Sequence, residues 1–313
     1  MHLFDQAIGL VRAGTPLALV TVIRISGSTP RHLGAKMLVD SDANIFGTIG
    51  GGRVEQDAME AGAKVASGAA AHTLRRDLIR DLAMCCGGSM ELYIEPVEQS
   101  IDALARALEL QRTRVPGRLV TTFDGSPKRV EELDRHGVRA PWSEQERFVE
   151  PVWPQDRAVI FGCGHVGKAL GPVLASVGFL PVLCDDDQTG ALEELPAWAH
   201  KVVSSFELVD IEREVGALGV GDYVVIATRD HAVDQRVLER LIVNESLSYL
   251  GLIGSRGKIG RFRKRLAAKG LATEERWQRL HAPIGLDISA ETPEEIAVSV
   301  AAELVAIRNR GRY

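Results

Sequence analysis

The sequence of 313 residues has few cysteines, little net charge and no long apolar run. Four cysteines, two of them adjacent, are too few for a disulfide framework, which favours a reducing compartment and predicts a cytoplasmic protein. A net charge of −5 argues against general nucleic-acid binding, which needs a basic surface. The longest uncharged run, Ala169 to Cys184, is shorter than the roughly 20 apolar residues of a membrane span, so we expect no membrane association.

The N-terminus also lacks a basic region followed by an apolar core, because Asp5 interrupts it, and we expect no signal peptide. A hydrophobic content of 45% and a charged content of 25% are those of an ordinary globular protein. The length predicts roughly two domains, each with its own core. We place them at residues 1–150 and 157–313, joined by a proline-containing linker near residues 150–156.

The first domain has the pattern of a mixed α/β (α+β) unit. Helical spacing of apolar residues predicts a helix from Leu3 to Val11, and the β-branched run from Leu17 to Ile25 predicts a buried strand. Two short strands on either side of residues 41–44 predict a hairpin. The alanine-rich segment from Val54 to Ala71 predicts a helix, and the alternation from Met90 to Ile94 predicts another strand.

Three consecutive glycines, Gly50, Gly51 and Gly52, stand directly before the alanine-rich helix. Bare backbone N–H groups and the positive end of the helix dipole would meet there, which suits a phosphate or a similar anion. Arg31, Lys36 and Arg53 lie near in the sequence and would add positive charge. The alternative is that the glycines only make a tight turn between strand and helix.

Cys85 and Cys86 are followed by two glycines and a strand, a place that a ligand could approach closely. A thiolate there would be reactive if nearby N–H groups or arginine lowered its pKa. The alternative is a pair of buried structural thiols. Two thiols are too few for a structural zinc site, and adjacent cysteines seldom form a disulfide because its geometry is strained.

The second domain begins with a strand, then Gly162, Gly164 and Gly167 in Gly-x-Gly-x-x-Gly spacing, then an apolar helix and a second strand that ends at Asp185. This context predicts a Rossmann-like doubly wound parallel sheet, with a nucleotide as a possible ligand of the loop. The same residues nearly match a P-loop. Ala169 stands where a Mg²⁺-binding hydroxyl is needed, so we do not expect an NTPase.

Two polar stretches, Thr228–Asp234 and Gly254–Lys258, follow later strands of this domain. Ligands bind at the carboxyl ends of strands in open parallel sheets, so both stretches are candidates. His165, His231 and His281 could line one crevice there. The alternative for each is a hydrogen-bonded loop histidine.

Together these stretches resemble the xanthine dehydrogenase accessory proteins of the XdhC/CoxI family. The resemblance covers both halves of the chain, whereas residues 97–154 carry no recognised motif. The matching stretches are Gly27–Arg31, Gly47–Gly52 with Glu55, Cys86–Gly88, Phe161–Val166, Thr228–His231, Ile253–Arg256, and Ile284–Ile288 continuing through Thr292–Glu295.

The resemblance implies a chaperone for the molybdenum cofactor (molybdopterin), with no enzymatic turnover of its own. Such proteins protect the cofactor, support its sulfuration by a cysteine desulfurase, and deliver it to the molybdenum-binding subunit of xanthine dehydrogenase or to a related hydroxylase. We place the site between the glycine loops of the two domains, with Cys85 and Cys86 as possible molybdenum ligands and Cys163 as a possible second thiol. A homodimer is also expected. The predicted cofactor-binding residues are Arg31, Gly50, Gly51, Gly52, Arg53, Glu55, Cys85, Cys86, Gly162, Gly164, His165, Gly167, Asp185, His231 and Arg256.

The main alternative is an NAD(P)-dependent oxidoreductase that uses the Gly-x-Gly-x-x-Gly loop, with Asp185 bound to a ribose. Against it, no Tyr-x-x-x-Lys pair exists, because Ala227 and Ile253 stand four residues after Tyr223 and Tyr249. That argument excludes only one class of dehydrogenase. A scaffold whose Rossmann unit has lost its ligand is a third possibility.

Overall fold

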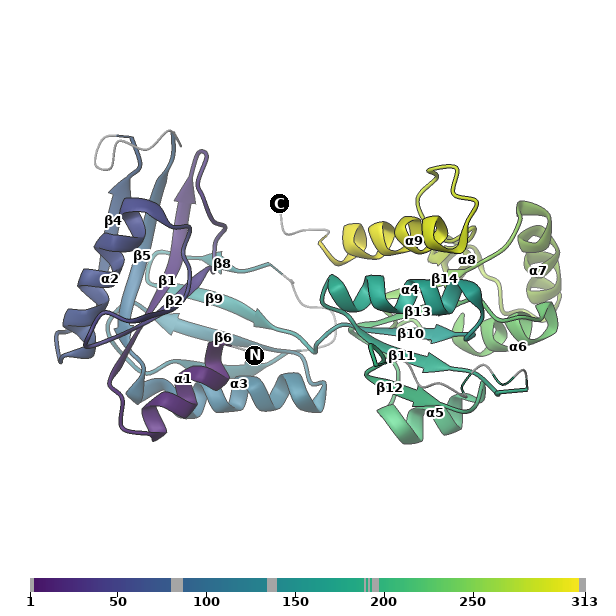
Figure 1. The fold of residues 1–313 in the computed structure, drawn as a ribbon, viewed down its shortest axis with the longest axis horizontal. Coiled ribbons are helices and arrows are strands. Elements are labelled where there is room, and N and C mark those ends of the chain that lie inside the picture. The colour runs from purple at the N-terminus through teal and green to yellow at the C-terminus, as the bar shows by residue number, and fades with distance from the viewer. Residues whose placement is uncertain are drawn as a thin grey trace. The chain divides into compact units, whose positions relative to one another are not determined.

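The computed structural model describes residues 3–79, 87–133, 140–188, 190, 192 and 197–309 (Figure 1). The chain forms two compact units, Met1–Pro154 and Gln155–Gly311. Among the described residues, no helix has both the length and the apolar character that crossing a membrane would require.

The N-terminal unit contains two antiparallel sheets among its described residues. Five strands in the order β3-β2-β1-β5-β4 form one sheet, and four in the order β7-β6-β9-β8 form the other. The strands are β1 (Leu17–Ser26), β2 (Lys36–Asp40), β3 (Ile45–Gly47), β4 (His72–Asp77), β5 (Ser89–Pro96), β6 (Gly117–Thr122), β7 (Arg129–Glu132), β8 (Trp142–Ser143) and β9 (Arg147–Val152). The helices are α1 (Leu3–Arg12), α2 (Gly52–Ala66), the 3₁₀ turn η1 (Glu98–Ser100) and α3 (Ile101–Thr113).

Strand β1 is buried on both faces, which explains its continuous apolar sequence. Ala18 and Val20 contribute to the core that α2 covers, while Leu17 and Leu19 contribute to the core that α1 and α3 cover. Helix α2 packs so closely against β2 that a Cβ on Gly62 would lie 2.8 Å from the side chain of Val39.

Helix α2 ends at Ala66, earlier than the predicted Ala71. Gly68, with a φ of +104°, is in the left-handed region, and β4 begins at His72. The glycine therefore ends the helix in a segment whose alanine content had indicated continuation.

The C-terminal unit is a parallel sheet of six strands in the order β12-β11-β10-β13-β14-β15, among its described residues. The strands are β10 (Arg157–Phe161), β11 (Leu180–Cys184), β12 (Lys201–Val203), β13 (Asp222–Ile226), β14 (Tyr249–Leu252) and β15 (Leu280–His281). The helices are α4 (His165–Ser176), α5 (Leu208–Val215), α6 (His231–Leu241), α7 (Arg256–Ala268), α8 (Glu274–Gln278) and α9 (Pro293–Arg308).

Both faces of the parallel sheet are covered by helices, as Figure 1 shows. Helices α4 and α9 bury one apolar cluster, and α5, α6 and α7 bury the other. The strand order reverses between β10 and β13, which is the doubly wound Rossmann arrangement that the sequence predicts. Helix α9 starts at a capping box, in which Thr292 and Glu295 bond to each other's backbone N–H groups.

Candidate functional site

In the N-terminal unit, two glycine motifs distant in sequence meet at the ends of β1 and β5. Ser26 at the end of β1 pairs with Ser89 at the start of β5, so the loops that adjoin these residues are neighbours. A Cβ on Gly88 would lie 2.4 Å from the carbonyl oxygens of Ser26 and Ser28. Only glycine permits this close approach of the two backbones.

The Gly47–Gly52 loop joins the same cluster. A Cβ on Gly50 would lie 2.8 Å from Cγ of Pro30 and 3.2 Å from Cγ of Arg31. Arg31 therefore lies against the glycine loop, and both it and Arg53, in the first turn of α2, are exposed. The described parts of the three N-terminal motifs thus come together in one place.

Glu55 uses part of the predicted anion cradle at the start of α2. Its Oε2 accepts hydrogen bonds from Thr48 Oγ1 at 2.5 Å, Ile49 N at 3.0 Å and Gly51 N at 3.2 Å. Burial acts to raise the pKa of Glu55, but these hydrogen bonds outweigh it and hold the pKa below its usual value. The carboxylate therefore fixes the glycine loop from inside and occupies donors that an external anion would need.

Cys85 and Cys86 lie outside the described residues, so their roles as thiols and molybdenum ligands stay predictions. Among the described residues, no group of three or more histidine, cysteine or carboxylate side chains is arranged to hold a metal ion.

Each glycine in the Gly162–Gly167 loop of the C-terminal unit has a separate structural role. Gly162 has a φ of +115°, and a Cβ there would lie 2.3 Å from the carbonyl oxygen of Ala227. A Cβ on Gly167 would lie 2.0 Å from the carbonyl oxygen of Gly162, which brings α4 close to β10. Gly164 has no heavy atom within 4 Å of its Cβ position and is the N-cap of α4, with no side-chain cap. A phosphate can approach the bare helix start there.

Asp185 is 4% exposed and is already engaged by backbone groups. Its Oδ2 accepts a hydrogen bond from Cys163 N at 2.7 Å, and its Oδ1 accepts one from Asp187 N at 3.0 Å. The neighbouring Asp186 forms a two-pronged pair with Arg229 at 2.6 and 2.8 Å. Asp185 therefore holds the glycine loop in place and offers little surface to a ribose.

The thiol of Cys163 does not face the loop opening. Cys163 is 1% exposed and belongs to the apolar cluster under α4 and α9, where burial raises its pKa. Burial also raises the pKa of Cys184, at the end of β11. The suggestion that Cys163 supplies a second thiol at the glycine loop is therefore wrong, since a core thiol is neither accessible nor ionised.

A buried ion pair ties together the two polar stretches that follow β13 and β14. Asp234, 0% exposed, accepts hydrogen bonds from N and Oγ1 of Thr228 and from Nζ of Lys258. Lys258, 5% exposed, also donates to the carbonyl oxygen of Ile253 at 2.9 Å. Residue type and spacing did not predict this contact, although Asp234 and Lys258 both lie in the first turn of their helices, α6 and α7.

The three histidines do not share one crevice. His165 and His231 are exposed first residues of α4 and α6 at the carboxyl ends of strands, as is Arg256 of α7. His281 instead stacks on Tyr249 with ring centroids 4.5 Å apart, and its Nδ1 lies 2.8 Å from Glu303 Oε1.

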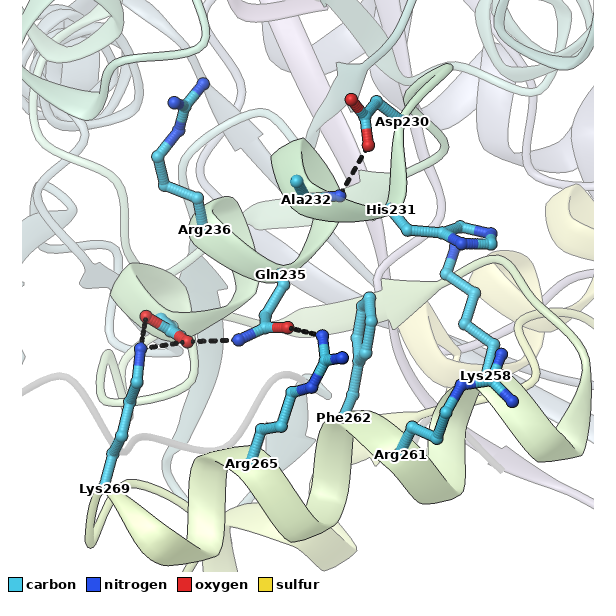
Figure 2. A pocket seen from close by; sticks show the side chains of 11 residues that line it. Asp230, His231, Ala232, Gln235, Arg236, Lys258, Arg261, Phe262, Arg265 and Lys269 are labelled. Carbon is cyan, nitrogen blue, oxygen red and sulfur yellow. Dashed lines mark hydrogen bonds and ion pairs between the residues drawn. The ribbon is translucent and has the colours of Figure 1, made fainter.

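His281 pairs with Gly251 of β14, but its ring stacks on Tyr249, the first residue of that strand. It lines a pocket of about 240 Å³ with Tyr249, whereas His231 lines a separate groove of about 460 Å³ between α6 and α7 (Figure 2). The expectation that His281 joins the other two is wrong, because its ring contacts Tyr249 and Glu303 and lines a different pocket from the one that His231 lines.

Two family models match the chain, each within one of the two units. Residues 10–77 match the XdhC and CoxI family, and residues 158–304 match the XdhC Rossmann domain. The first match includes the Gly27–Arg31 and Gly47–Gly52 loops, and the second includes the Gly162–Gly167 loop.

Relatives are similar over nearly the whole chain. The chain is 30% identical to the Escherichia coli K12 protein YqeB across 99% of its own length, and it spans about half (47%) of that relative. It is 25% identical to a probable xanthine dehydrogenase subunit of Bacillus subtilis 168, covering 93% of each chain. It is also 25% identical to the molybdenum cofactor insertion chaperone PaoD of E. coli K12, over 96% of this chain and 86% of PaoD.

A crystal structure from Bacillus halodurans, described as a xanthine dehydrogenase, has the same fold. It is 25% identical in sequence, covers 100% of this chain and 97% of its own, and superposes with a TM-score of 0.77.

Proposed function

Because the chain belongs to the XdhC and CoxI family, we propose that it is a chaperone that binds the molybdenum cofactor and assists maturation of a molybdenum enzyme. The similarity to PaoD, a molybdenum cofactor insertion chaperone, supports this role because it extends over 96% of this chain. The similarity to a probable xanthine dehydrogenase subunit supports xanthine dehydrogenase or a related hydroxylase as the recipient. On this proposal the protein carries the cofactor and does not itself oxidise a substrate.

One observation carries the proposal at the level of the site: the uncapped start of α4 at Gly164. Molybdopterin carries a phosphate, and bare N–H groups at a helix start bind phosphate. Gly162 and Gly167 bring this helix start against the ends of β10 and β13, and Asp185 fixes the loop through Cys163 N. The donors are therefore preorganised before any ligand binds.

The N-terminal unit would contribute positive charge and sulfur. Arg31 lies against the glycine loop and Arg53 projects from the first turn of α2, so both can attract an anionic cofactor. We propose Cys85 and Cys86 as soft ligands, because thiolate sulfur suits this metal better than carboxylate oxygen. On this proposal the metal of the cofactor would take part in redox chemistry only after its transfer to the recipient enzyme. The cysteine desulfurase as sulfur donor, the homodimer and the cytoplasmic location belong to the same proposal.

The helix start at Gly164 provides a sharp test. Gly164 has φ −74° and ψ −171°, which any N-cap residue can adopt, so both Gly164→Asp and Gly164→Asn should cap α4 and preserve the fold. The Asp variant adds a negative charge where the phosphate would bind, and we expect it to retain at least about tenfold less cofactor than the Asn variant. Molybdenum and pterin content after purification from a host that makes the cofactor measures the effect. Equal contents in the wild type and the Asp variant would refute the proposed site.

An NAD(P)-dependent oxidoreductase remains the second candidate, favoured by the strand order and the intact glycine loop. The burial of Asp185 counts against it. A ligand at 100 times its Kd stabilises the native state by roughly 2.7 kcal/mol. Thermal stabilisation by NAD or NADP, with none by the molybdenum cofactor, would therefore replace the chaperone proposal with this one.

A further inference from the structure

Helices α6 and α7 lie side by side and are joined by a regular series of side-chain pairs. Arg265 donates to Gln235 Oε1 at 2.7 Å, and Lys269 donates to Glu239 at 2.7 and 2.8 Å. Both pairs have the same separation of thirty positions in the sequence. Four residues is about one helical turn, so the pairs stand one turn apart on both helices.

One turn earlier, the same spacing places His231 opposite Arg261. In contrast to the other two pairs, these two side chains share no hydrogen bond. No hydrogen bond or ion pair joins His231 or Arg261 to any residue that the structure describes. Figure 2 shows both side chains at the same end of the groove, beyond the bond between Gln235 and Arg265.

The surroundings leave this end of the groove positive. Arg265 bonds to an uncharged amide, so its charge is not neutralised there. Lys258 is neutralised by the buried Asp234, and Asp230 uses one oxygen to cap α6 through Ala232 N. Arg261 and Arg265 therefore face one carboxylate at this end, that of Asp230, in a groove of about 460 Å³. Glu239 also lines the groove, but it is paired with Lys269.

We propose that His231 and Arg261, assisted by Arg265, bind a phosphate group in this groove. The planar guanidinium fork matches phosphate oxygens, and the imidazole N–H provides a further donor. An extended acidic peptide fits less well, because Gln235 and Glu239 already occupy the next two positions along the groove. The site is formed by α6 and α7 and not by the Gly162–Gly167 loop, so it does not depend on the proposed chaperone function.

Calorimetric titration of the full chain at low salt tests the proposal, with inorganic phosphate and AMP as probes. We expect Arg261→Gln to weaken phosphate binding at least about tenfold, because a charge-assisted contact is lost. Lys264→Gln is the matched control: it removes the same charge from an exposed position of α7 that does not line the groove. Tighter binding of AMP than of phosphate would identify a phosphate ester as the ligand, and equal binding would identify free phosphate.

A second variant tests the same site without altering Arg261. Gln235→Glu would give Arg265 a carboxylate partner and add negative charge to the groove, so we expect weaker phosphate binding. Its melting temperature should fall only slightly, because the hydrogen bond from Gln235 to Glu239 is replaced by a like-charge pair one turn apart. The proposal is overturned if the wild type binds neither probe, or if Arg261→Gln and Lys264→Gln reduce binding equally, since the effect would then be one of net charge alone.

Discussion

Gly51 and Gly164 each cap a helix that follows a glycine loop, yet the two helix starts differ in what occupies them. Four residues after Gly51 stands Glu55, whose carboxylate returns to the loop and accepts its N–H groups. Four residues after Gly164 stands Lys168, which is exposed. The start of α2 is therefore filled by the protein's own anion, whereas the N-cap of α4 has no side-chain cap.

Replacing Glu55 by glutamine should cost about 1–3 kcal/mol of stability at neutral pH, because the bonds to a charged acceptor are weakened. The pKa of Glu55 is lowered in the folded protein, so its stabilisation is present above its ordinary pKa and is lost as pH falls through the lowered value. Urea unfolding of the variant and the wild type should therefore differ at pH 7 and converge in acid. Glu60→Gln, an exposed position of the same helix, is the control. A difference that persists unchanged in acid would contradict this account.

Residue types and spacing indicated which glycines form the two loops, but not which groups the nearby carboxylates bond to. The roles of Gly162 and Gly167 follow from the motif, since both touch backbone that the fold itself brings near. The partners of Asp185 and Glu55 depend on rotamers that a linear sequence does not specify. For the same reason the buried pair of Glu95 and Lys128, each 1% exposed in its side chain, could not be predicted, and Lys128 lies in a region that carries no motif.

At the scale of elements, the carboxyl ends of β13 and β14 are held together by one ion pair across α6 and α7. Asp234 and Lys258 each lie within the first turn of their helix, so their bond fixes where both helices start. His231 and Arg256 are then placed by those helix starts. The periodicity of the sequence predicted the strands and helices here, but the coupling between them arises only in the fold.

Replacing Lys258 by methionine should destabilise the protein by about 3–5 kcal/mol, because Asp234 is left buried without its cation. Chemical denaturation measures the loss. In the double variant Lys258→Met with Asp234→Asn, the amide still accepts from Thr228 and no charge is buried, so most of the stability should return. A single variant as stable as the wild type would show that the ion pair contributes nothing.

At the scale of the whole molecule, each unit has apolar clusters made from its own residues. The sequence pattern differs between the two halves: the first half mixes strands and helices irregularly, and the second half repeats strand and helix in turn. Each pattern predicts a core of its own, and the length of the chain also indicates two domains. The sequence could not show that a relative such as YqeB is about twice as long as this chain.

Separate expression of residues 1–154 and 155–313 tests whether the two units are independent folding domains. A segment of about 150 residues buries roughly 68–70% of its surface on folding, which suffices for a stable core, so we expect both segments to unfold cooperatively in urea. The groove between α6 and α7 lies wholly in the second segment. Its affinity for inorganic phosphate, measured by calorimetry, should therefore stay within about twofold of that of the full chain. A tenfold loss would correspond to a missing contact worth about 1.4 kcal/mol, and no residue of the first segment lines the groove. Loss of the cooperative transition in residues 155–313 would mean that this core requires the first unit.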